Sequence, residues 1–283
     1  MGLFGSQRRT GMPDSSDRIE PSVRARVAER IDRLEAEHGV TALYVCESGS
    51  RAWGFPSTDS DYDVRVLYAH PRDWYLSIDL ERCDDTIDPP IVDEIDVHGW
   101  DLRKALGLFQ STNPTLLEWL RSPLVYRESA AVMRRWRGLI PDYYTPDAIG
   151  PAYRGMAQSV AEQNLTGETV SHKAYLYVLR ALLAVRWIER EDGPPPVAFE
   201  RLVEATVERT DVREAVGALV VRKRAGREQA DGPRLPTLHD FIEAERDRQA
   251  TLSFSTSTDR PGVAPLNTFF RWVLTRHVPD EEC

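Results

Sequence analysis

The sequence predicts an α+β protein, with its strands in the first half and a second half that is mostly helical. Apolar or alternating segments at residues 40–46, 61–68 and 95–100 are typical of strands. From about residue 129 onward no convincing alternation follows, and apolar residues instead recur three and four positions apart, as on one face of a helix. We therefore expect the strand-forming half and the helical half to be separate domains.

The 283 residues are sufficient for one large domain or two modest ones. We expect a boundary near residue 128, which gives a strand-containing domain at 20–128 and a helical domain at 129–283. Residues 1–19 mix Gly, Ser, Arg and Asp with almost no apolar periodicity. Such a segment buries too little apolar surface to fold by itself, so we expect a disordered arm there.

The first helix is expected directly after this arm. Ser22 follows a proline and is a favourable N-cap residue, and Gly39 is of the type at which helices often end. Between them, four apolar residues recur at helical spacing: Val23, Val27, Ile31 and Leu34. The apolar run at 40–46 is bounded by polar residues and is therefore expected to be a buried strand.

The second strand is expected at 61–68, where polar and apolar residues alternate strictly. Alternate side chains of a strand point to opposite faces, so Asp61, Asp63 and Arg65 share one face.

A third strand is expected at 95–100, and Asp96 is one of its polar residues. Asp101 is expected to cap the helix that follows, and Asn113, which precedes a proline, to begin another. The acidic connection at 71–94 contains prolines and is the segment that we expect to be a mobile loop.

The second half contains one long helical pattern and several shorter ones. The long helix is expected at 171–190, where leucines and a tryptophan form an apolar stripe, and a Gly-Pro-Pro-Pro segment ends it. Further helices are expected at 197–209, 211–224, 236–249 and 265–276.

The charge is acidic and unevenly distributed. The chain has a formal net charge of −9, and residues 1–128 carry 15 basic and 23 acidic side chains against 21 and 22 in residues 129–283. A protein that coats nucleic acid needs a surplus of basic residues to neutralise phosphates, so this balance excludes that class. Any contact with nucleic acid must be local, and the excess carboxylates of the first half are available to hold cations.

The composition also bears on cellular location and on membrane association. No segment approaches the roughly 20 apolar residues of a membrane helix, and the N-terminus lacks the apolar core of a secretory signal. We therefore expect a cytoplasmic protein without a membrane partner. The three cysteines are scattered and have no metal-ligand spacing, which excludes a disulfide framework and a zinc cluster.

Asp61 and Asp63 stand two positions apart on an expected strand, so their carboxylates lie side by side. Two like charges about 4 Å apart repel each other, and removal from water adds to the cost unless a cation lies between them. Mg²⁺ takes oxygen ligands and commonly joins protein carboxylates to substrate phosphates, and Mn²⁺ is an alternative. If Asp96 faces the same crevice, three carboxylates could hold two ions. The alternative for an Asp-x-Asp pair is a solvated strand edge.

The turn before this strand favours the metal-binding interpretation. Gly49 and Ser50 follow a buried strand, where small residues let phosphate oxygens approach backbone N–H groups. Ten residues separate Ser50 from Asp61, and the stretch reads GSRAWGFPSTDSDYDVR. This arrangement resembles the Gly-Ser, then Asp-x-Asp pattern of the DNA polymerase beta-type nucleotidyltransferase superfamily.

Within that superfamily, the later segments Trp100–Lys104 and Asn113–Pro123 look like those of bacterial nucleotidyltransferases associated with RNA repair. The resemblance is specific over residues 41–126 and weaker over 150–190. It implies a mixed-sheet catalytic domain that binds a nucleoside triphosphate such as ATP, followed by a helical C-terminal domain.

Carried over position by position, the resemblance implies that Gly49 and Ser50 contact the phosphates and that Asp61 and Asp63 are metal ligands. Asp96 is the expected third carboxylate, which would deprotonate or position the attacking hydroxyl. Asp101 is its rival, although its position as a helix cap is a sufficient structural explanation.

Basic residues supply further candidates for contacts with the triphosphate. Arg65 shares a face with the aspartates and either contacts phosphate or forms a structural ion pair, and Arg51 lies in the turn itself. Lys173, Tyr177 and Arg180 lie on one face of the long helix and suit a triphosphate or an RNA backbone. The alternative for this face is solvated surface, and on either interpretation loss of Lys173 or Arg180 should barely change stability.

A second basic group, Arg222-Lys223-Arg224 with Arg227, is either an RNA-phosphate contact or a solvated helix end.

The sequence and the resemblance together predict a magnesium-dependent nucleotidyltransferase. An acceptor hydroxyl would attack the α-phosphorus of a nucleoside triphosphate and expel pyrophosphate. The acceptor suggested by the resemblance is an RNA end. Two alternatives stay open: transfer of a nucleotide, for example AMP, to a protein hydroxyl, and a nucleotide-binding module without turnover.

Overall fold

The computed structural model describes residues 19–190, 193–226, 231–254 and 260–279. Its elements in chain order are α1 (Pro21–His38), β1 (Thr41–Glu47), α2 (Gly49–Trp53), β2 (Tyr62–Ala69), the 3₁₀ helices η2 (Arg72–Leu76) and η3 (Leu80–Arg82), β3 (Thr86–Ile87), β4 (Ile95–Asp101), α3 (Leu102–Gln110), α4 (Pro114–Leu120), β5 (Val125–Glu128), α5 (Ala130–Gly138), α6 (Ile140–Tyr143), α7 (Pro146–Asn164), β6 (Thr169–Ser171), α8 (His172–Arg190), α9 (Phe199–Thr206), α10 (Thr210–Ala225), β7 (Asp231–Pro233), α11 (Pro236–Ala250) and α12 (Ala264–Arg276).

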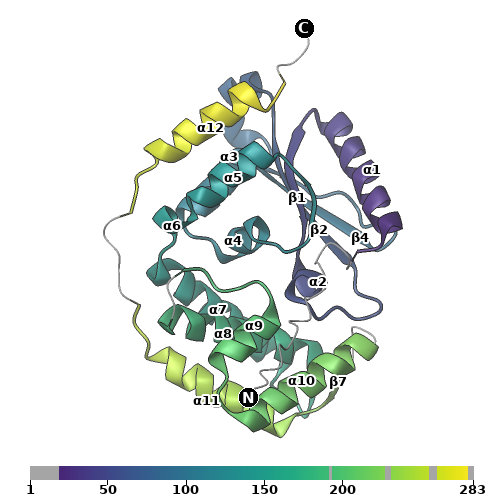
Figure 1. Ribbon diagram of the computed structural model, residues 1–283, viewed down its shortest axis with the longest axis vertical. Helices are drawn as coiled ribbons and strands as arrows, with labels where there is room; N and C mark the ends of the chain where they lie inside the picture. The colour runs from purple at the N-terminus through teal and green to yellow at the C-terminus, as the bar shows by residue number, and fades with distance from the viewer. Residues whose placement is uncertain (1–18, 191–192, 227–230, 255–259, 280–283) are drawn as a thin grey trace, which may run out of the picture.

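A mixed five-stranded sheet forms the centre of the first half, with the strand order β3-β4-β2-β1-β5. Strands β2 and β4 are parallel, and each of the other neighbouring pairs is antiparallel. Helices α7 to α11 form the lower part of the molecule in Figure 1, whereas the sheet, α1 and α12 lie above them. The predicted α+β class, with a mixed sheet followed by a mostly helical region, is therefore confirmed.

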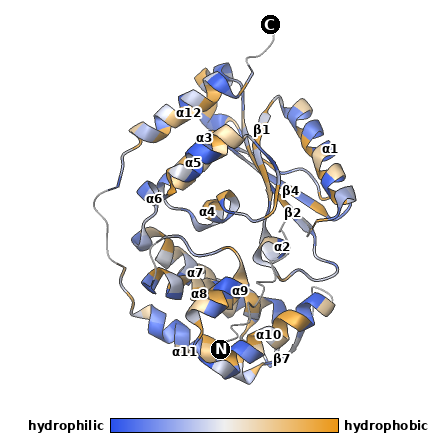
Figure 2. Cartoon of the chain, viewed as in Figure 1, coloured by the Kyte–Doolittle hydropathy of each residue, from blue (hydrophilic) through white to orange (hydrophobic). Residues whose placement is uncertain are grey.

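The two faces of the sheet bury different side chains. Along β2, Val64, Val66 and Tyr68 point toward α1, and α1 contributes the apolar stripe that the sequence predicts. Blue and orange segments alternate along α1 in Figure 2, as expected for a helix with one buried side. Leu67 and Ala69 of β2 point to the opposite face, which belongs to the larger core cluster. Since Asp63 and Arg65 alternate with the α1-facing residues, they lie on the face of the sheet away from α1.

Helix α1 begins one residue before the predicted cap. Its first residue is Pro21 and Glu20 occupies the N-cap position without a side-chain cap bond, so the prediction of Ser22 as N-cap is wrong. Proline has a fixed φ and no N–H to leave unpaired, which suits it to the first turn of a helix. Helix α1 ends at Gly39, with φ of 63°, as predicted. The predicted arm falls outside the described residues except for Ile19, which is buried.

The connection at 71–94 has more structure than the sequence suggests. It contains η2, η3 and the short strand β3, which pairs with β4 at the edge of the sheet. The pairing gives partners to backbone groups of β4 that would otherwise lack them. The segment is therefore not without regular structure, and its mobility stays a prediction.

The helical half is built around α8. This helix packs against α7, α9 and α11, and most of its residues are buried. Strands β6 and β7 form a two-stranded antiparallel sheet that is not evident from the sequence, because three-residue strands are too short to show alternation. One core cluster includes residues from Leu43 to Val278, so apolar packing continues across residue 128. The division into two domains stays a prediction. Among the described residues, every helix is too short or too polar to cross a membrane.

Candidate functional site

Asp63 and Asp96 lie directly opposite each other on the parallel strands β2 and β4. Arg65 joins them: its Nη2 donates to Asp63 Oδ1 at 2.6 Å, and its Nη1 donates to Asp96 Oδ2 at 2.9 Å. The guanidinium thus engages one oxygen of each carboxylate. Arg65 thus forms ion pairs with both carboxylates and brings these two predicted residues together, whereas its contact with a phosphate stays a prediction.

Asp61 precedes the first residue of β2, and Arg51 of α2 holds the backbone at this point. The Arg51 guanidinium donates to the carbonyl oxygens of Ser60 and Asp61 at 2.6 and 3.2 Å, and it lies 3.8 Å from the centre of the Tyr62 ring. These contacts fix the chain segment that carries Asp61 at the start of the strand.

Gly49 lies against the Asp63 carboxylate. Its φ is +58°, and a Cβ at this position would come within 2.0 Å of Asp63 Oδ2. Only glycine combines this conformation with so close an approach. The next residue, Ser50, is buried, and its hydroxyl donates to Ser60 Oγ at 3.4 Å. The predicted turn and the predicted carboxylate are therefore in direct contact.

Glu47 is a buried carboxyl group behind this turn. Its Oε1 accepts the backbone N–H of Asp63 at 3.0 Å, and its Oε2 accepts the Tyr126 hydroxyl at 2.5 Å. Burial raises the pKa of Glu47 to about 7, against the opposing effect of these hydrogen bonds. Glu47 therefore connects the end of β1 to β2 at Asp63 and to β5 at Tyr126.

Burial also raises the pKa of Asp63, and the negative charges of Asp96 and Asp61 act in the same direction. The positive charges of Arg65 and Lys173 act in the opposite direction. A desolvated carboxylate with two carboxylate neighbours supplies the oxygen donors that Mg²⁺ takes, and an added cation would relieve their repulsion. The donor chemistry fits a divalent metal, although within the described ranges no three acidic, histidine or cysteine side chains are already gathered closely enough to hold one.

Asp101, the rival of Asp96, has a structural role at the start of α3. Its Oδ1 accepts the backbone N–H of Arg103 at 2.7 Å, as an N-cap does, and its Oδ2 accepts the Tyr75 hydroxyl at 2.5 Å. Burial raises the pKa of Asp101. The cap that the sequence predicts is confirmed, and it places both carboxylate oxygens of Asp101 in protein contacts.

Helix α8 brings Lys173 and Tyr177 toward the sheet. The Lys173 charge acts on Asp63, and its Nζ lies 5.4 Å from the centre of the Tyr177 ring. Tyr177 packs edge-on against Trp53 of α2, with 4.9 Å between ring centres. These two predicted residues therefore lie beside the turn and the carboxylates.

Arg180 is on the same helix but is 5% exposed, so the alternative of a solvated face is wrong at this position. Its Nη1 donates to Glu118 Oε1 at 2.7 Å, and its guanidinium lies 4.3 Å from the Trp53 ring centre. Glu118 of α4 also accepts the Trp53 indole N–H and the Tyr153 hydroxyl, at 3.1 and 2.9 Å. Arg180 thus joins α8 to α4 and α2 beneath the turn.

The end of α10 contacts the loop between α2 and β2, and sequence reasoning missed this contact. Lys223 is buried and its Nζ donates to Ser57 Oγ at 3.4 Å, while Thr58 Oγ1 donates to the Gly226 carbonyl oxygen at 3.2 Å. Arg224 donates to the carbonyl oxygen of Gly54. The expectation of a solvated helix end is therefore wrong for Lys223, and Arg227 lies outside the described residues. A lysine in a chain with only three was the available signal.

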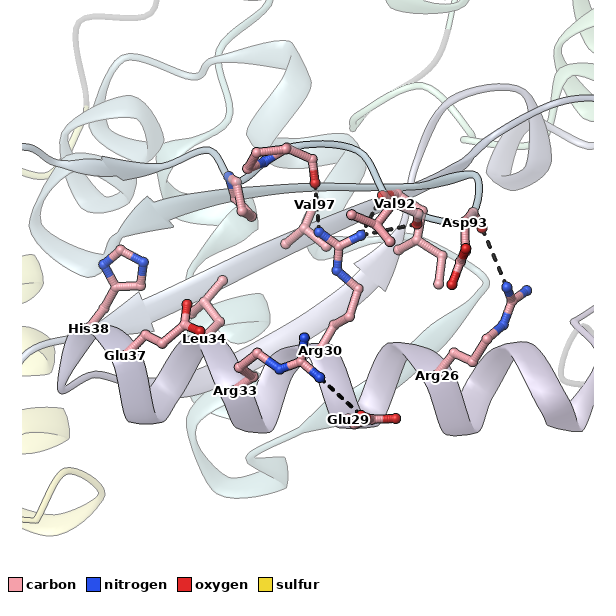
Figure 3. Close-up of a pocket in the computed structure, with 13 residues that line it drawn as sticks. Arg26, Glu29, Arg30, Arg33, Leu34, Glu37, His38, Val92, Asp93 and Val97 are labelled. Carbon is pink, nitrogen blue, oxygen red and sulfur yellow. Dashed lines mark hydrogen bonds and ion pairs between the residues drawn. The ribbon is translucent and has the colours of Figure 1, made fainter.

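A separate cavity of about 290 Å³ lies between α1 and residues 89–97. In Figure 3, Arg30 reaches from α1 to the segment that carries Val92, and Arg26 points to Asp93. Arg30 donates to the carbonyl oxygens of Pro90, Val92 and Ile95 at 2.8, 3.1 and 2.9 Å. None of the predicted site residues lines this cavity, which is on the α1 side of the sheet.

Comparison with known proteins identifies a family that matches most of the chain. Residues 23–272 match the profile of the RNA repair pathway DNA polymerase beta family, RlaP. The chain is 42% identical over 226 residues to the uncharacterized protein YcgL of Bacillus subtilis (strain 168), covering 80% of this chain and 86% of YcgL. A nucleotidyltransferase-like protein from Exiguobacterium sibiricum 255-15, whose structure is solved, aligns with 77% of this chain and 76% of its own, at 9% identity and a TM-score of 0.28.

Proposed function

The chain belongs to the RNA repair pathway DNA polymerase beta family, and from this premise we propose that it transfers a nucleoside monophosphate from a nucleoside triphosphate to a hydroxyl acceptor. The acceptor that we propose is an RNA end, on the strength of the family's description. The observation that most supports the transfer is the close approach of Gly49 to the Asp63 carboxylate, which lies opposite Asp96 on the neighbouring strand.

Asp61, Asp63 and Asp96 would hold the divalent metal, with Mg²⁺ as the proposed ion. When bound, such a metal stabilises the negative charge that develops on the oxygens around the reacting phosphorus. The remaining roles belong to this chain's own residues. Asp96 positions the acceptor hydroxyl and accepts its proton, and Arg65 holds Asp96 and Asp63 in register while partly balancing their charge.

The binding residues that we propose surround the same place. Gly49 and Ser50 contact the phosphates, and Lys173 and Tyr177 approach them from α8. Arg51 orders the segment that carries Asp61. Arg180 acts through Glu118 and Trp53 to support the turn, and it is not assigned a contact with the ligand.

In this reaction the acceptor oxygen forms a bond to the α-phosphorus. The bond between that phosphorus and the oxygen leading to the β-phosphate breaks, and pyrophosphate leaves with the bonding electrons. The proton of the acceptor hydroxyl passes to the Asp96 carboxylate. Because the protein forms no covalent bond to the substrate in this reaction, its main contribution is to position the reacting groups.

The acceptor is tested by incubating the protein with each α-labelled triphosphate, Mg²⁺, and either RNA or cell lysate. We expect the label to appear in RNA with the wild-type protein and not with Asp63→Asn. Label in a protein band that resists ribonuclease would instead establish nucleotidylation of a protein hydroxyl. Label in neither, with triphosphate still bound, would establish a nucleotide-binding module and overturn the proposed transfer.

A further inference from the structure

A chain of hydroxyl groups connects the Gly49–Ser50 turn to a lysine of the helical half. Ser50 Oγ donates to Ser60 Oγ at 3.4 Å, the Oγ atoms of Ser60 and Ser57 are 2.7 Å apart, and Lys223 Nζ donates to Ser57 Oγ at 3.4 Å. All four side chains are buried, and Lys223 is only 7% exposed. This series of hydrogen bonds therefore runs from α2 to the last turn of α10, shielded from bulk solvent.

The direction of each hydrogen bond follows from the number of hydrogen bonds that each hydroxyl oxygen can accept. Ser60 Oγ accepts from Ser50 and also from the backbone N–H of Ser57, at 3.0 Å. A hydroxyl oxygen has two acceptor positions, so the Ser60 proton is directed to Ser57. Ser57 Oγ then accepts from both Ser60 and Lys223. In this arrangement the Ser50 proton points into the protein.

A phosphate oxygen can only accept hydrogen bonds, so it needs the opposite arrangement. Ser50 can donate to a phosphate only if its proton turns away from Ser60. Ser60 then donates to Ser50, and Ser57 donates to Ser60. In both arrangements Lys223 donates to the Ser57 oxygen, because an ammonium group donates hydrogen bonds and cannot accept them. A lysine at the far end therefore favours the outward direction of the whole chain.

We propose that Lys223 is a positioning residue whose ammonium group, acting through Ser57 and Ser60, orients the Ser50 hydroxyl toward a phosphate oxygen of the bound nucleoside triphosphate. This proposal rests on the proposed function of the turn. Lys223 itself does not touch the ligand, and its effect passes through the two serines. The helical half thereby contributes to phosphate binding at a turn that belongs to the first half.

The first test is calorimetric titration of Lys223→Met with magnesium and a triphosphate that carries a methylene group between its α- and β-phosphorus. Methionine has nearly the same length without a charge. We expect binding to weaken about tenfold, as for loss of one hydrogen bond to a charged group. Lys104→Met is the matched control, because Lys104 is paired with Asp85 and takes no part in the serine chain. Its affinity should equal that of the wild type.

Thermal unfolding without ligand separates this effect from a fault in folding. Lys223→Met should still unfold in one cooperative transition, which shows that the weakened binding is measured on folded protein. Lys223→Arg keeps a donor-only cation and should recover most of the lost affinity. Should Lys223→Met fail to fold, Ser57→Ala decides the question, because it interrupts the same chain without removing a charge.

Double substitution tests the connection itself. If Lys223 acts through Ser57, Ser57→Ala should weaken binding by a similar factor, and the double variant should bind no more weakly than either single variant. Additive losses, or unchanged affinity in folded Lys223→Met or in Ser57→Ala, would overturn the role of Lys223. Failure of the wild-type protein to bind the triphosphate would instead overturn the proposed function, so the two failures are distinguishable.

Discussion

The folded structure disfavours ionisation of the Asp63 carboxyl group. Its pKa is raised by burial and by two neighbouring carboxylates, although Arg65 donates to it. A carboxyl group whose pKa is higher in the folded state opposes folding once it is ionised, so at neutral pH this charge destabilises the metal-free protein. Metal binding at Asp63, as proposed, would offset this cost.

We expect Asp63→Asn to lower turnover by more than about a hundredfold, because even residues that only support metal ligands commonly contribute ten- to a hundredfold. The unfolding temperature without metal should be unchanged or higher. The measurements are nucleotide transfer and thermal unfolding, with the exposed Asp79→Asn as control. Turnover like that of the wild type would remove Asp63 from the site, and Asp61→Asn should behave in the same way.

Asp96 and Asp101 give a second prediction at this scale. Asp96→Asn should abolish transfer, since it removes the proposed proton acceptor. Asp101→Asn should be mild, because asparagine also caps helices well and can still accept the Arg103 N–H. The comparison requires only relative transfer rates of the two variants. The reverse order, with Asp101 essential and Asp96 dispensable, would show that the wrong carboxylate has been assigned.

Helix α8 shows how neighbouring positions of one element have different roles. Arg180 forms a buried ion pair with Glu118, whereas Lys173 is only partly buried and carries its charge near Asp63. We expect Arg180→Met to lower the free energy of unfolding by about 3–5 kcal/mol, because the Glu118 carboxylate is left buried without its partner. Lys173→Met should change it by no more than about 0.5 kcal/mol.

Urea unfolding of the two α8 variants checks this difference, and triphosphate titration complements it. Lys173→Met should weaken triphosphate binding about tenfold or more. Equal stability of the two variants would contradict the structural role of Arg180. Restored stability in the double variant Arg180→Met with Glu118→Gln would support that role further, since the uncompensated charge is then also removed.

The segment after β2 gives a pH prediction. Burial, with a smaller effect of His38, lowers the pKa of His70 to about 4, and its ring stacks on Trp74 with 3.8 Å between ring centres. Tyr68 and Tyr75 pack edge-on around the same ring. Unfolded His70 binds a proton below about pH 6.5, so stability should fall as the pH decreases from about 6.5 to 4.

His70→Phe keeps an aromatic ring against Trp74 and removes the titration. Thermal unfolding measured between pH 4 and 7 should therefore show a smaller loss of stability toward low pH than the wild type shows. An unchanged slope in this variant would show that other groups cause the acid sensitivity.

Much of this architecture could be predicted from the sequence, because local patterns determine it. The alternation at 61–68, the cap at Asp101 and the spacing from Ser50 to Asp61 each depend on residues close together in the chain. The surroundings of Arg180 and Lys223 could not be predicted, because they come from distant segments of the chain. Their partners Glu118 and Ser57 lie 62 and 166 positions away in the chain, and helical periodicity contains no information about such contacts.

At the scale of the whole molecule, the helical half contributes to the proposed site from two directions. Lys173 of α8 acts on Asp63, and Lys223 of α10 reaches the serine chain behind the turn. The first half is strongly acidic and the second nearly balanced, so positive charge near the carboxylates comes partly from the second half. If the protein binds a triphosphate as proposed, we expect both parts of the chain to contribute to that binding.

The central claim is transfer at the α-phosphorus, and the position of the label tests it most directly. Parallel reactions contain Mg²⁺, RNA, and the same triphosphate labelled at either the α- or the γ-phosphorus. We predict that the acceptor gains the α label only and that the γ label is released as pyrophosphate, with neither product formed by Asp63→Asn. Appearance of the γ label in the acceptor, or its release as orthophosphate, would contradict nucleotidyl transfer.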